Sequence, residues 1–533
     1  MQLTKVTDML LVNILAVLFF VFLWEGLPVP SGTEMVYLLT AYKQFHPDFL
    51  LNDWNFSIPQ PEHRLFELLS GALTLVMPME VLGWIGRLAC WSLTLWALFR
   101  IGKRYEIPYW MISLGIVVWL VSRQALIGQE YIIGSFEAKS VAYVFLLFAL
   151  DGLLDGRHLI PGLFLGLSFT FHPAVGLWAC LAAGLTLLAT RFPVKKLMAM
   201  AACAALGALP AVLFLLPTVV GNAHATLEDW KYIVLVRFPY HFDPLSWPKR
   251  EILLTYMLFL FSWLHSRQCR QNDALKFLTL FQGFLCVFFT AGILLRLGEQ
   301  YEWLKFMPMR LFPVFALLLF FFHLMHAYRH SPSVRLGSGG VLLAFLCLLG
   351  LKNPLSEIAD GARFNYLTWT QEDTDLQRAY KWFPAHSPNA SIILSPPWKD
   401  DSVYLTQRAQ VAYWGYAPYG HLSEWRSRLR AVASENWQQM SGEMQVEQME
   451  SFYSQLTEQD IAAIVKQYGG DYLVSKGRYS YPILFDSGTY KVYELNRQDH
   501  SIIPAVRADQ ELVPHPQPVS DRSAQDGKKT ESR

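Results

Sequence analysis

The stretch GQEYIIGSFEAKSVAYVFLLFAL, residues 128–150, decides the class of fold. A run apolar enough to enter a membrane follows directly on Glu130, Glu137 and Lys139. A charged side chain at membrane depth costs about 2.5–3.5 kcal/mol, so such residues are usually paired or face a polar cavity. We therefore expect a membrane span here, with charged partners for these residues elsewhere in the chain.

The composition of the whole chain agrees with a membrane protein. Of its residues, 53% are hydrophobic and 16% are charged, whereas a soluble chain carries about 25% charged residues. The net charge of +1 provides no field that would attract nucleic acid, so no nucleic-acid partner is expected. The cysteines lie in or beside apolar runs and show no CxxC spacing or disulfide framework.

The apolar runs predict about eleven membrane crossings. The segment 159–190 is too long for one span and is interrupted at His172 and Pro173, so two short helices are expected there. Basic residues fall on alternate connections, which predicts a cytoplasmic N-terminus, retained as a first span, and a C-terminal domain on the outer face. The other runs able to span or nearly span about 30 Å of hydrocarbon are 9–27, 81–100, 107–122, 139–155, 197–219, 251–266, 274–295, 307–328 and 338–353.

The sequence divides into three regions of different composition. Residues 1–355 are expected to form a polytopic, all-α membrane bundle with an amphipathic first outer loop at 28–80. Residues 360–497 read as a small outer α/β domain that serves as a lid or acceptor platform, and 498–533 as a disordered tail. The expected strands lie in ASIILSPP, RAQVAYW, DYLVSKG, YPILFDS and YKVYEL, and the expected helices at 371–385 and 420–468.

Two carboxylates in the first outer loop are catalytic candidates. Glu34 begins an amphipathic helix, although Ser31-x-x-Glu34 also fits a capping box, in which the carboxylate binds a backbone N–H. Asp53 stands where the chain leaves that region, and a turn formed with Asn52 is the alternative. Both roles stay open for each residue.

Cations at the outward ends of spans are candidates for binding an anion. Lys139 is expected to face an anionic lipid headgroup, with Glu130 and Glu137 lining the same cavity, although Glu137 and Lys139 could simply neutralise one another. The fork of Arg310 matches a carboxylate or a phosphate, and an ion pair with Glu137 or Glu302 is the competing interpretation. Other candidates for substrate binding are His63, Arg64, His172, Arg237, His241, Asp243 and Lys305, of which His63, Arg64 and His172 also have simpler structural explanations.

Several motifs are absent from the sequence. There is no P-loop, no GxGxxG after a strand, no GxSxG and no HExxH. An ATP-driven pump or a serine hydrolase is therefore not expected. No cofactor is indicated by a motif, and a requirement for a divalent metal stays open.

The pattern resembles the GT-C superfamily of integral-membrane glycosyltransferases. The features in common are one span, a long outer loop with an acidic residue, about eleven spans and an outer α/β domain. The chain resembles most an uncharacterised bacterial branch with FEAKS-like, HP-like and RFPYHF-like segments, here at Phe136–Ser140, His172–Pro173 and Arg237–Phe242. It departs from the mannosyltransferases of the superfamily, because Glu34 stands alone where they carry an adjacent acidic pair.

The resemblance implies a sugar transferase of the bacterial inner membrane. Such an enzyme uses a polyprenyl-phosphate-linked sugar on the outer face, a loop carboxylate as base and basic residues around the lipid phosphate. Its expected partners are the lipid bilayer, the donor lipid and an unknown envelope acceptor. The alternatives are a protein that binds or transports a lipid-linked saccharide without bond chemistry, and an envelope assembly factor.

Overall fold

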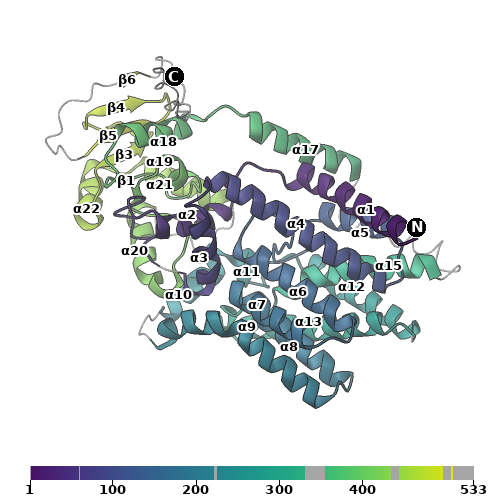
Figure 1. Ribbon diagram of the computed structural model, residues 1–533. Coiled ribbons are helices and arrows are strands. Elements are labelled where there is room, and N and C mark those ends of the chain that lie inside the picture. The colour runs from purple at the N-terminus through teal and green to yellow at the C-terminus, as the bar shows by residue number, and fades with distance from the viewer. Residues whose placement is uncertain are drawn as a thin grey trace, which may run out of the picture.

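The computed structural model describes residues 2–58, 60–220, 225–269, 271–330, 354–433, 443–495 and 506–507. A helical body carries a smaller unit with a β-sheet at one end (Figure 1). Within the body, each apolar run predicted between residues 9 and 328 is a helix. These helices are α1 (Gln2–Glu25), α4 (Met79–Arg104), α5 (Tyr109–Val121), α6 (Ala138–Leu154), α7 (Leu159–Phe171), α8 (Pro173–Ala189), α9 (Val194–Val220), α12 (Lys249–Gln268), α13 (Asp273–Leu297) and α15 (Leu311–His330).

Four helices of the described chain are long and apolar enough to cross a membrane. They contain Met79–Arg104, Val194–Leu216, Asp273–Leu297 and Leu311–His330. Four more apolar helical stretches are shorter: Met9–Glu25, Tyr109–Val121, Leu159–Phe171 and Pro173–Ala189. The expected count of about eleven crossings therefore stays a prediction. The run 338–353 lies outside the described residues.

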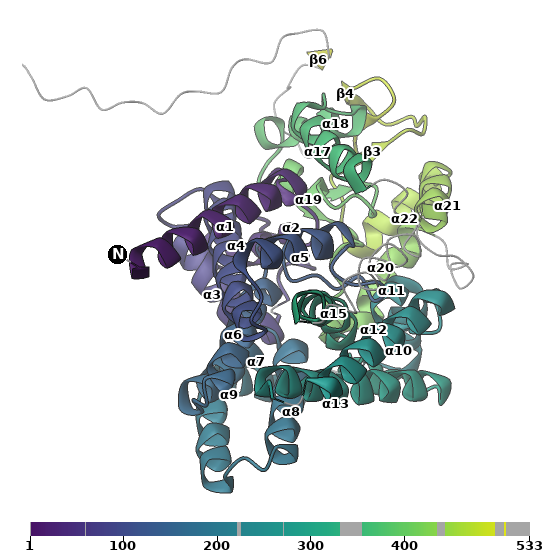
Figure 2. The same cartoon turned by 90° about the vertical axis from the view of Figure 1, so that its right-hand side faces the viewer.

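Helix α15 lies in the middle of the body (Figure 2), where it packs against α5, α12 and α13. Its side chains are buried from Leu311 to Ala327. A helix that is apolar on every face is stable only when it is surrounded. The sequence LFPVFALLLFFF therefore explains the central position.

The chain breaks between α7 and α8 at His172, as predicted. Pro173 occupies the first turn of α8, where its missing N–H costs nothing. His172 caps that helix, because its Nδ1 accepts a hydrogen bond of 3.3 Å from the backbone N–H of Val175. The break therefore fixes the ring of His172 at the start of α8.

The long connections also contain short helices. The first loop forms α2 (Glu34–Phe45), a 3-10 turn (Pro61–His63) and α3 (Arg64–Leu73), so the helix expected to begin at Glu34 is present. Later connections form α10 (Leu227–Tyr232), a π-helical turn (Ile233–Arg237), α11 (Pro239–Phe242) and α14 (Tyr301–Leu304).

The C-terminal unit is an α/β structure around one sheet. Its strand order is β2-β1-β3-β5-β4-β6, with β1 parallel to β2 and β3, and β5 antiparallel to β3 and β4. All five predicted strands are confirmed: β1 (Ile392–Leu394), β2 (Ala409–Gln410), β3 (Tyr472–Ser475), β4 (Ile483–Asp486) and β5 (Lys491–Glu494). Its helices are α18 (Asp375–His386), α19 (Ser402–Thr406), α20 (Leu422–Val432), α21 (Glu443–Ser454) and α22 (Glu458–Tyr468), with a 3-10 turn (Tyr419–His421) before α20.

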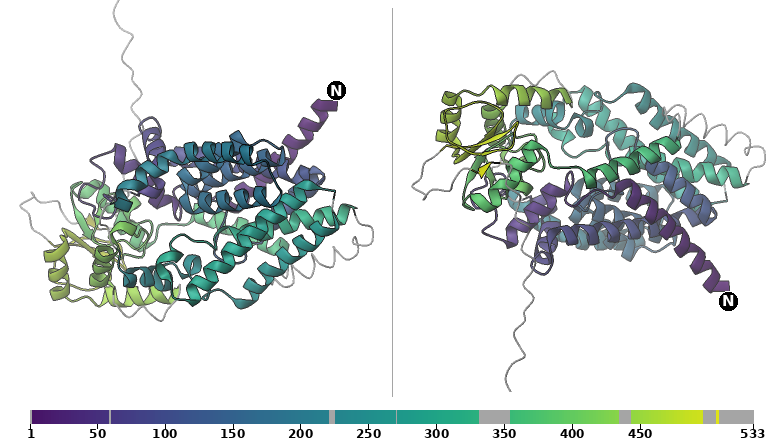
Figure 3. Two further views of the ribbon diagram at one scale, coloured as in Figure 1. Left: turned by 90° about the horizontal axis from the view of Figure 1, so that it is seen from below. Right: turned by 90° about the horizontal axis from the view of Figure 1, so that it is seen from above.

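Two elements of the structure do not fit the boundaries predicted for the outer domain, which are residues 360 and 497. Residues 360–370 belong to α17 (Pro354–Thr370), which runs beside α1 (Figure 3, right). Asn365 Nδ2 and Trp369 Nε1 donate hydrogen bonds of 2.7 Å to the carbonyls of Leu23 and Gly26. Within the tail predicted to be disordered, β6 (Val506–Arg507) pairs with β4, and the rest of 498–533 lies outside the described residues.

Candidate functional site

Lys139 lies in the first turn of α6, two residues after the helix cap Glu137. Its side chain is only 6% exposed, and its Nζ lies 3.3 Å from Glu137 Oε1. The same Nζ lies 3.4 Å from the centroid of the Tyr131 ring, a cation–π contact. Glu137 also accepts a hydrogen bond of 2.9 Å from Thr33 Oγ1. The predicted alternative, in which Glu137 and Lys139 form an ion pair, is thus present.

Arg310 stands directly before α15 and has a less complete set of partners. Its Nε lies 2.8 Å from Glu130 Oε2, but these two atoms are not aligned for a hydrogen bond. Its Nη1 contacts Met307 Sδ at 2.7 Å, and a thioether is a weak acceptor. Glu130 in turn accepts a hydrogen bond of 2.9 Å from Tyr143 Oη. The guanidinium, which is 11% exposed, thus meets one carboxylate and one weak acceptor in these contacts.

The two ion pairs lie close together. Burial raises the pKa of Tyr37 well above its usual value; the charge of Glu137 adds to this, and that of Arg310 opposes it. Burial lowers the pKa of His241 to about 3, and the charges of Arg310 and Lys139 act in the same direction. The pKa values of Tyr37 and His241 are thus each influenced by charges from both ion pairs. We name the group the polar cluster; its members are Tyr37, His63, Glu130, Tyr131, Glu137, Lys139, Tyr143, His172, His241 and Arg310.

Three histidines belong to the polar cluster and come from three different connections. The rings of His63 and His172 lie 5.1 Å apart between centroids. His63 Nδ1 lies 3.3 Å from the carbonyl oxygen of Phe171, and its Nε2 lies 3.3 Å from Tyr37 Oη. Burial lowers the pKa of His63 to about 4, so this ring is neutral at pH 7.

The other two histidines each keep one free ring nitrogen. His172 Nδ1 accepts from the backbone, so its Nε2 carries the proton. His241 Nδ1 lies 2.8 Å from the carbonyl oxygen of Gly128 and donates to it, so its Nε2 is an acceptor. Among the residues that the structure describes, none bonds to either Nε2. The polar cluster thus offers one free donor and one free acceptor beside its cations.

Arg237 lies at the edge of the polar cluster, but its contacts are with the C-terminal unit. Its Nε donates a hydrogen bond of 3.0 Å to the carbonyl of Trp414, and its guanidinium stacks over the rings of Phe238 and Trp414. Its charge also contributes to the lowered pKa of His241, after burial and the charges of Arg310 and Lys139. Arg237 therefore joins the polar cluster to the loop that follows β2.

The structure does not bring three of the predicted residues into the polar cluster. Arg64 Nη1 lies 3.3 Å from Glu67 Oε2 within α3. Asp243 Oδ1 accepts from Arg296 Nε at 2.9 Å. Lys305 is exposed and lies over the rings of Trp230 and Phe306.

Glu34 is buried in a network of structural contacts. Its Oε1 accepts hydrogen bonds from Arg87 Nε at 3.0 Å and from the backbone N–H of Phe136 at 2.8 Å. Its Oε2 accepts from Arg87 Nη2 and, at 3.1 Å, from the backbone N–H of Ser31. The last contact is the one that the capping-box alternative predicts. The catalytic role of Glu34 stays a prediction, and its contacts favour a structural role.

Both carboxylate oxygens of Asp53 also accept hydrogen bonds from structural donors. Asp53 is 1% exposed, and its Oδ1 accepts a hydrogen bond of 2.7 Å from the backbone N–H of Phe56. Its Oδ2 accepts one of 2.9 Å from the backbone N–H of Gln410 in β2. Asp53 therefore fastens the first outer loop to the C-terminal sheet, and its catalytic role also stays a prediction.

Sequence reasoning did not select Glu62, which lies beside the polar cluster. Glu62 is half-buried, no other described residue hydrogen-bonds to its carboxylate, and burial raises its pKa. The pKa of Tyr419 is raised first by burial and then by the charge of Glu62, and the charge of Arg310 opposes this rise. The charges of Glu62 and Arg310 thus both act on the pKa of the Tyr419 phenol. The only sequence signal was the position of Glu62 directly before His63.

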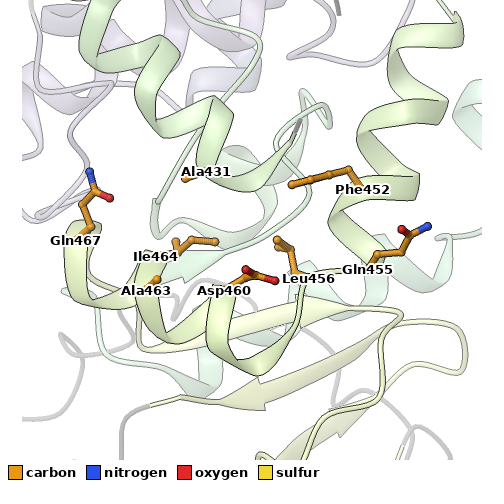
Figure 4. Close-up of a pocket in the computed structure, with 8 residues that line it drawn as sticks. All are labelled: Ala431, Phe452, Gln455, Leu456, Asp460, Ala463, Ile464 and Gln467. Carbon is orange, nitrogen blue, oxygen red and sulfur yellow. The ribbon is translucent and has the colours of Figure 1, made fainter. Parts of the chain in front are cut away.

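The C-terminal unit carries a separate pocket of about 400 Å³ between α20, α21 and α22 (Figure 4). Its walls are mainly apolar, with Phe452, Leu456 and Ile464 among them. Its one ionisable residue, Asp460, is used as the capping partner of Thr457 at the start of α22. This pocket therefore holds no group poised for catalysis.

No family model and no curated protein matches the chain. Among solved structures, the chain is similar to the archaeal oligosaccharyltransferase AglB from Archaeoglobus fulgidus, solved with an inhibitory peptide and a dolichol-phosphate. The similarity covers 88% of this chain and 69% of that chain, with 12% sequence identity and a TM-score of 0.48. The function of this chain therefore has to be argued from its own polar cluster.

Proposed function

We propose that this protein is a GT-C-like membrane glycosyltransferase that takes a sugar from a polyprenyl-phosphate-linked donor on the outer face of the bacterial inner membrane. The observation that carries the proposal is the Arg310 guanidinium, to which the described chain offers a misaligned Glu130 oxygen and a thioether. Its charge acts on His241 together with that of Lys139. The proposed topology has a cytoplasmic N-terminus and places the polar cluster at the outer ends of its spans.

A phosphate suits the groups that the polar cluster leaves unused. The guanidinium fork pairs with two phosphate oxygens better than with one thioether and one misaligned carboxylate. The Nε2–H of His172 offers another neutral donor, because its Nδ1 is already an acceptor. The apolar helices would hold the polyprenyl tail.

The chemistry needs a base as well as a cationic site. In the proposed reaction the bond between the anomeric carbon and the phosphate oxygen breaks, and the departing phosphate keeps the electron pair near Arg310 and Lys139. The acceptor oxygen or nitrogen bonds to the anomeric carbon, and its proton passes to a carboxylate. We assign this role to Glu62, because the oxygens of Glu34 and Asp53 are occupied by structural donors.

The C-terminal unit has a proposed part in acceptor recognition. Arg237 donates to the carbonyl of Trp414, so the loop after β2 lies against the polar cluster. We propose that this loop and the unit 360–497 act as the lid or acceptor platform.

Lipid binding tests the proposal directly. The full chain in nanodiscs is titrated with undecaprenyl phosphate, and Arg310→Met and Lys139→Met are each expected to weaken binding more than tenfold, or about 1.4 kcal/mol. The matched controls are Arg250→Met and Lys231→Met, which remove the same charges outside the polar cluster. Unchanged binding in both cluster variants would overturn the proposal.

A second candidate, a carrier of lipid-linked saccharides without bond chemistry, is favoured by the contacts of Glu34 and Asp53. If both predicted catalytic carboxylates are structural, the polar cluster could bind the lipid phosphate and release it unchanged. Translocation of a fluorescent lipid-linked sugar across liposomes, together with no transfer to any acceptor, would favour the carrier. Transfer of radiolabelled sugar would favour the enzyme.

A further inference from the structure

A second cluster of ionisable groups lies at the far end of α15 from Arg310. His326 is in the last turns of this helix of 20 residues, so the two sites are separated by about 25 Å along the helix. His326 faces His265 and Cys269 at the end of α12, and His265 Nε2 lies 3.0 Å from His326 Nδ1. This group has no part in the proposed transfer reaction.

The sequence spacing and the helix packing explain why these side chains meet. Cys269 is the C-cap of α12, and its N–H bonds to the carbonyl of His265 four residues earlier, which brings the two side chains together at the helix end. Helix α12 packs against α15, which supplies His326. Cys269 Sγ lies 3.6 Å from His265 Nε2 and 3.9 Å from His326 Nδ1.

These distances are close to those of a tetrahedral metal site. With zinc–nitrogen bonds of about 2.0–2.1 Å and a zinc–sulfur bond of about 2.3 Å, tetrahedral angles separate two nitrogens by about 3.4 Å and nitrogen from sulfur by about 3.6 Å. The observed separations of 3.0, 3.6 and 3.9 Å need shifts of only a few tenths of an ångström. All three ligand atoms lie within 4.8 Å of one another.

We propose that His265 Nε2, Cys269 Sγ and His326 Nδ1 bind a zinc ion that joins α12 to α15. Two imidazoles and one thiolate suit zinc, and a water molecule would fill the fourth position. On binding, the thiol of Cys269 gives its proton to solvent, and both imidazoles bind through a lone pair in their neutral form.

Neighbouring groups can support the ligands. Glu106 and His330 offer ligand atoms within 4.8 Å of one of His326. A carboxylate near a metal-binding histidine commonly accepts the other ring N–H and fixes the orientation of the ring. The site would also hold the end of α15 in place without any role for the polar cluster.

Metal analysis of the full chain tests the proposal. The protein is purified in detergent with a streptavidin-binding tag instead of a polyhistidine tag, incubated with zinc and desalted. Mass spectrometry of the metal is expected to find about one zinc per chain, as in a specific protein site. Cys269→Ser and His326→Ala are each expected to lose most of it, while the controls Cys286→Ser and His158→Ala keep it. Zinc that is substoichiometric in the wild type, or equal in wild type and the Cys269→Ser and His326→Ala variants, would overturn the proposal.

A second measurement remains decisive if a ligand variant fails to fold. The wild-type chain is loaded with Co²⁺, and a thiolate-to-cobalt charge-transfer band is expected in the near ultraviolet. Zinc should also protect Cys269 from alkylation by N-ethylmaleimide, with Cys286 as the internal reference. Absence of the band, or equal alkylation of Cys269 with and without zinc, would refute the site.

Discussion

The Glu34 carboxylate and the Arg87 guanidinium form a two-point ion pair that is buried between α2 and α4. Both side chains are at most 1% exposed. The backbone N–H groups of Ser31 and Phe136 complete the bonding of the carboxylate. Glu34 therefore joins the first outer loop, α4 and the segment before α6, which carries Glu137.

The first prediction is that Glu34→Gln destabilises the protein. Removing one partner of a buried ion pair leaves the other charge unpaired and costs about 3–5 kcal/mol. The melting temperature of the full chain in detergent should fall clearly, and Glu34→Leu combined with Arg87→Met should recover part of the loss. If Glu34→Gln melts like the wild type but abolishes sugar transfer, Glu34 is the catalytic base after all.

The second prediction concerns the contact between Asp53 and the C-terminal unit. Asp53→Ala removes the acceptor of the Gln410 N–H, and leaving a buried donor unsatisfied costs about 1–3 kcal/mol. Hydrogen–deuterium exchange of the 408–414 peptide should become faster. Asp48→Ala, an exposed aspartate of the same loop, is the control and should leave this exchange unchanged. Equal exchange in both variants would show that Asp53 does not hold the sheet.

The helices and strands were predictable because their signals are local. Runs of apolar residues located the long helices of the body, and His172 with Pro173 located the break between α7 and α8. Short β-rich segments located the five strands from β1 to β5 in the same way. The position of α17 beside α1 was not predictable, because it depends on contacts between residues more than 340 positions apart.

The partners of the charged residues were harder to predict, because ion pairs join distant parts of the chain. The alternative for Arg310 was an ion pair with Glu137 or Glu302, but the carboxylate that it meets is that of Glu130. One missed signal was available in the sequence. Arg87 lies inside the predicted span 81–100, and an arginine at that depth needs an acidic partner, which is Glu34.

The third prediction is a pH dependence that originates at Glu67. Burial raises the pKa of this carboxyl from 4.5 to about 7, against hydrogen bonding by Gln44 and the charge of Arg64. The folded state thus binds the proton more tightly than the unfolded state, so stability falls as pH rises from about 4.5 to about 7. The full shift corresponds to a free energy on the order of 3 kcal/mol.

Glu67→Gln tests this dependence. The amide can still accept from Gln44 without carrying a charge, so the variant should match the wild type at pH 5 and melt at a higher temperature at pH 8. Glu228→Gln, which changes an exposed carboxylate, should follow the wild type at both pH values. A wild-type melting temperature that rises between pH 5 and pH 8 together with that of Glu67→Gln would contradict the assignment.

The last prediction distinguishes Glu62 from Glu34 and Asp53 as the base of the proposed transfer. Glu62→Gln keeps the size of the side chain and breaks no hydrogen bond with another described residue. The variant should therefore fold and melt like the wild type and bind undecaprenyl phosphate normally, since Arg310 and Lys139 are unchanged.

Loss of a general base lowers the rate by about 10²–10⁴-fold. Single-turnover transfer from undecaprenyl-phosphate-linked hexoses should show this loss in Glu62→Gln and not in Glu302→Gln, an exposed glutamate on α14. Full transfer activity in Glu62→Gln would remove Glu62 from the reaction and return the role of base to Glu34 or Asp53.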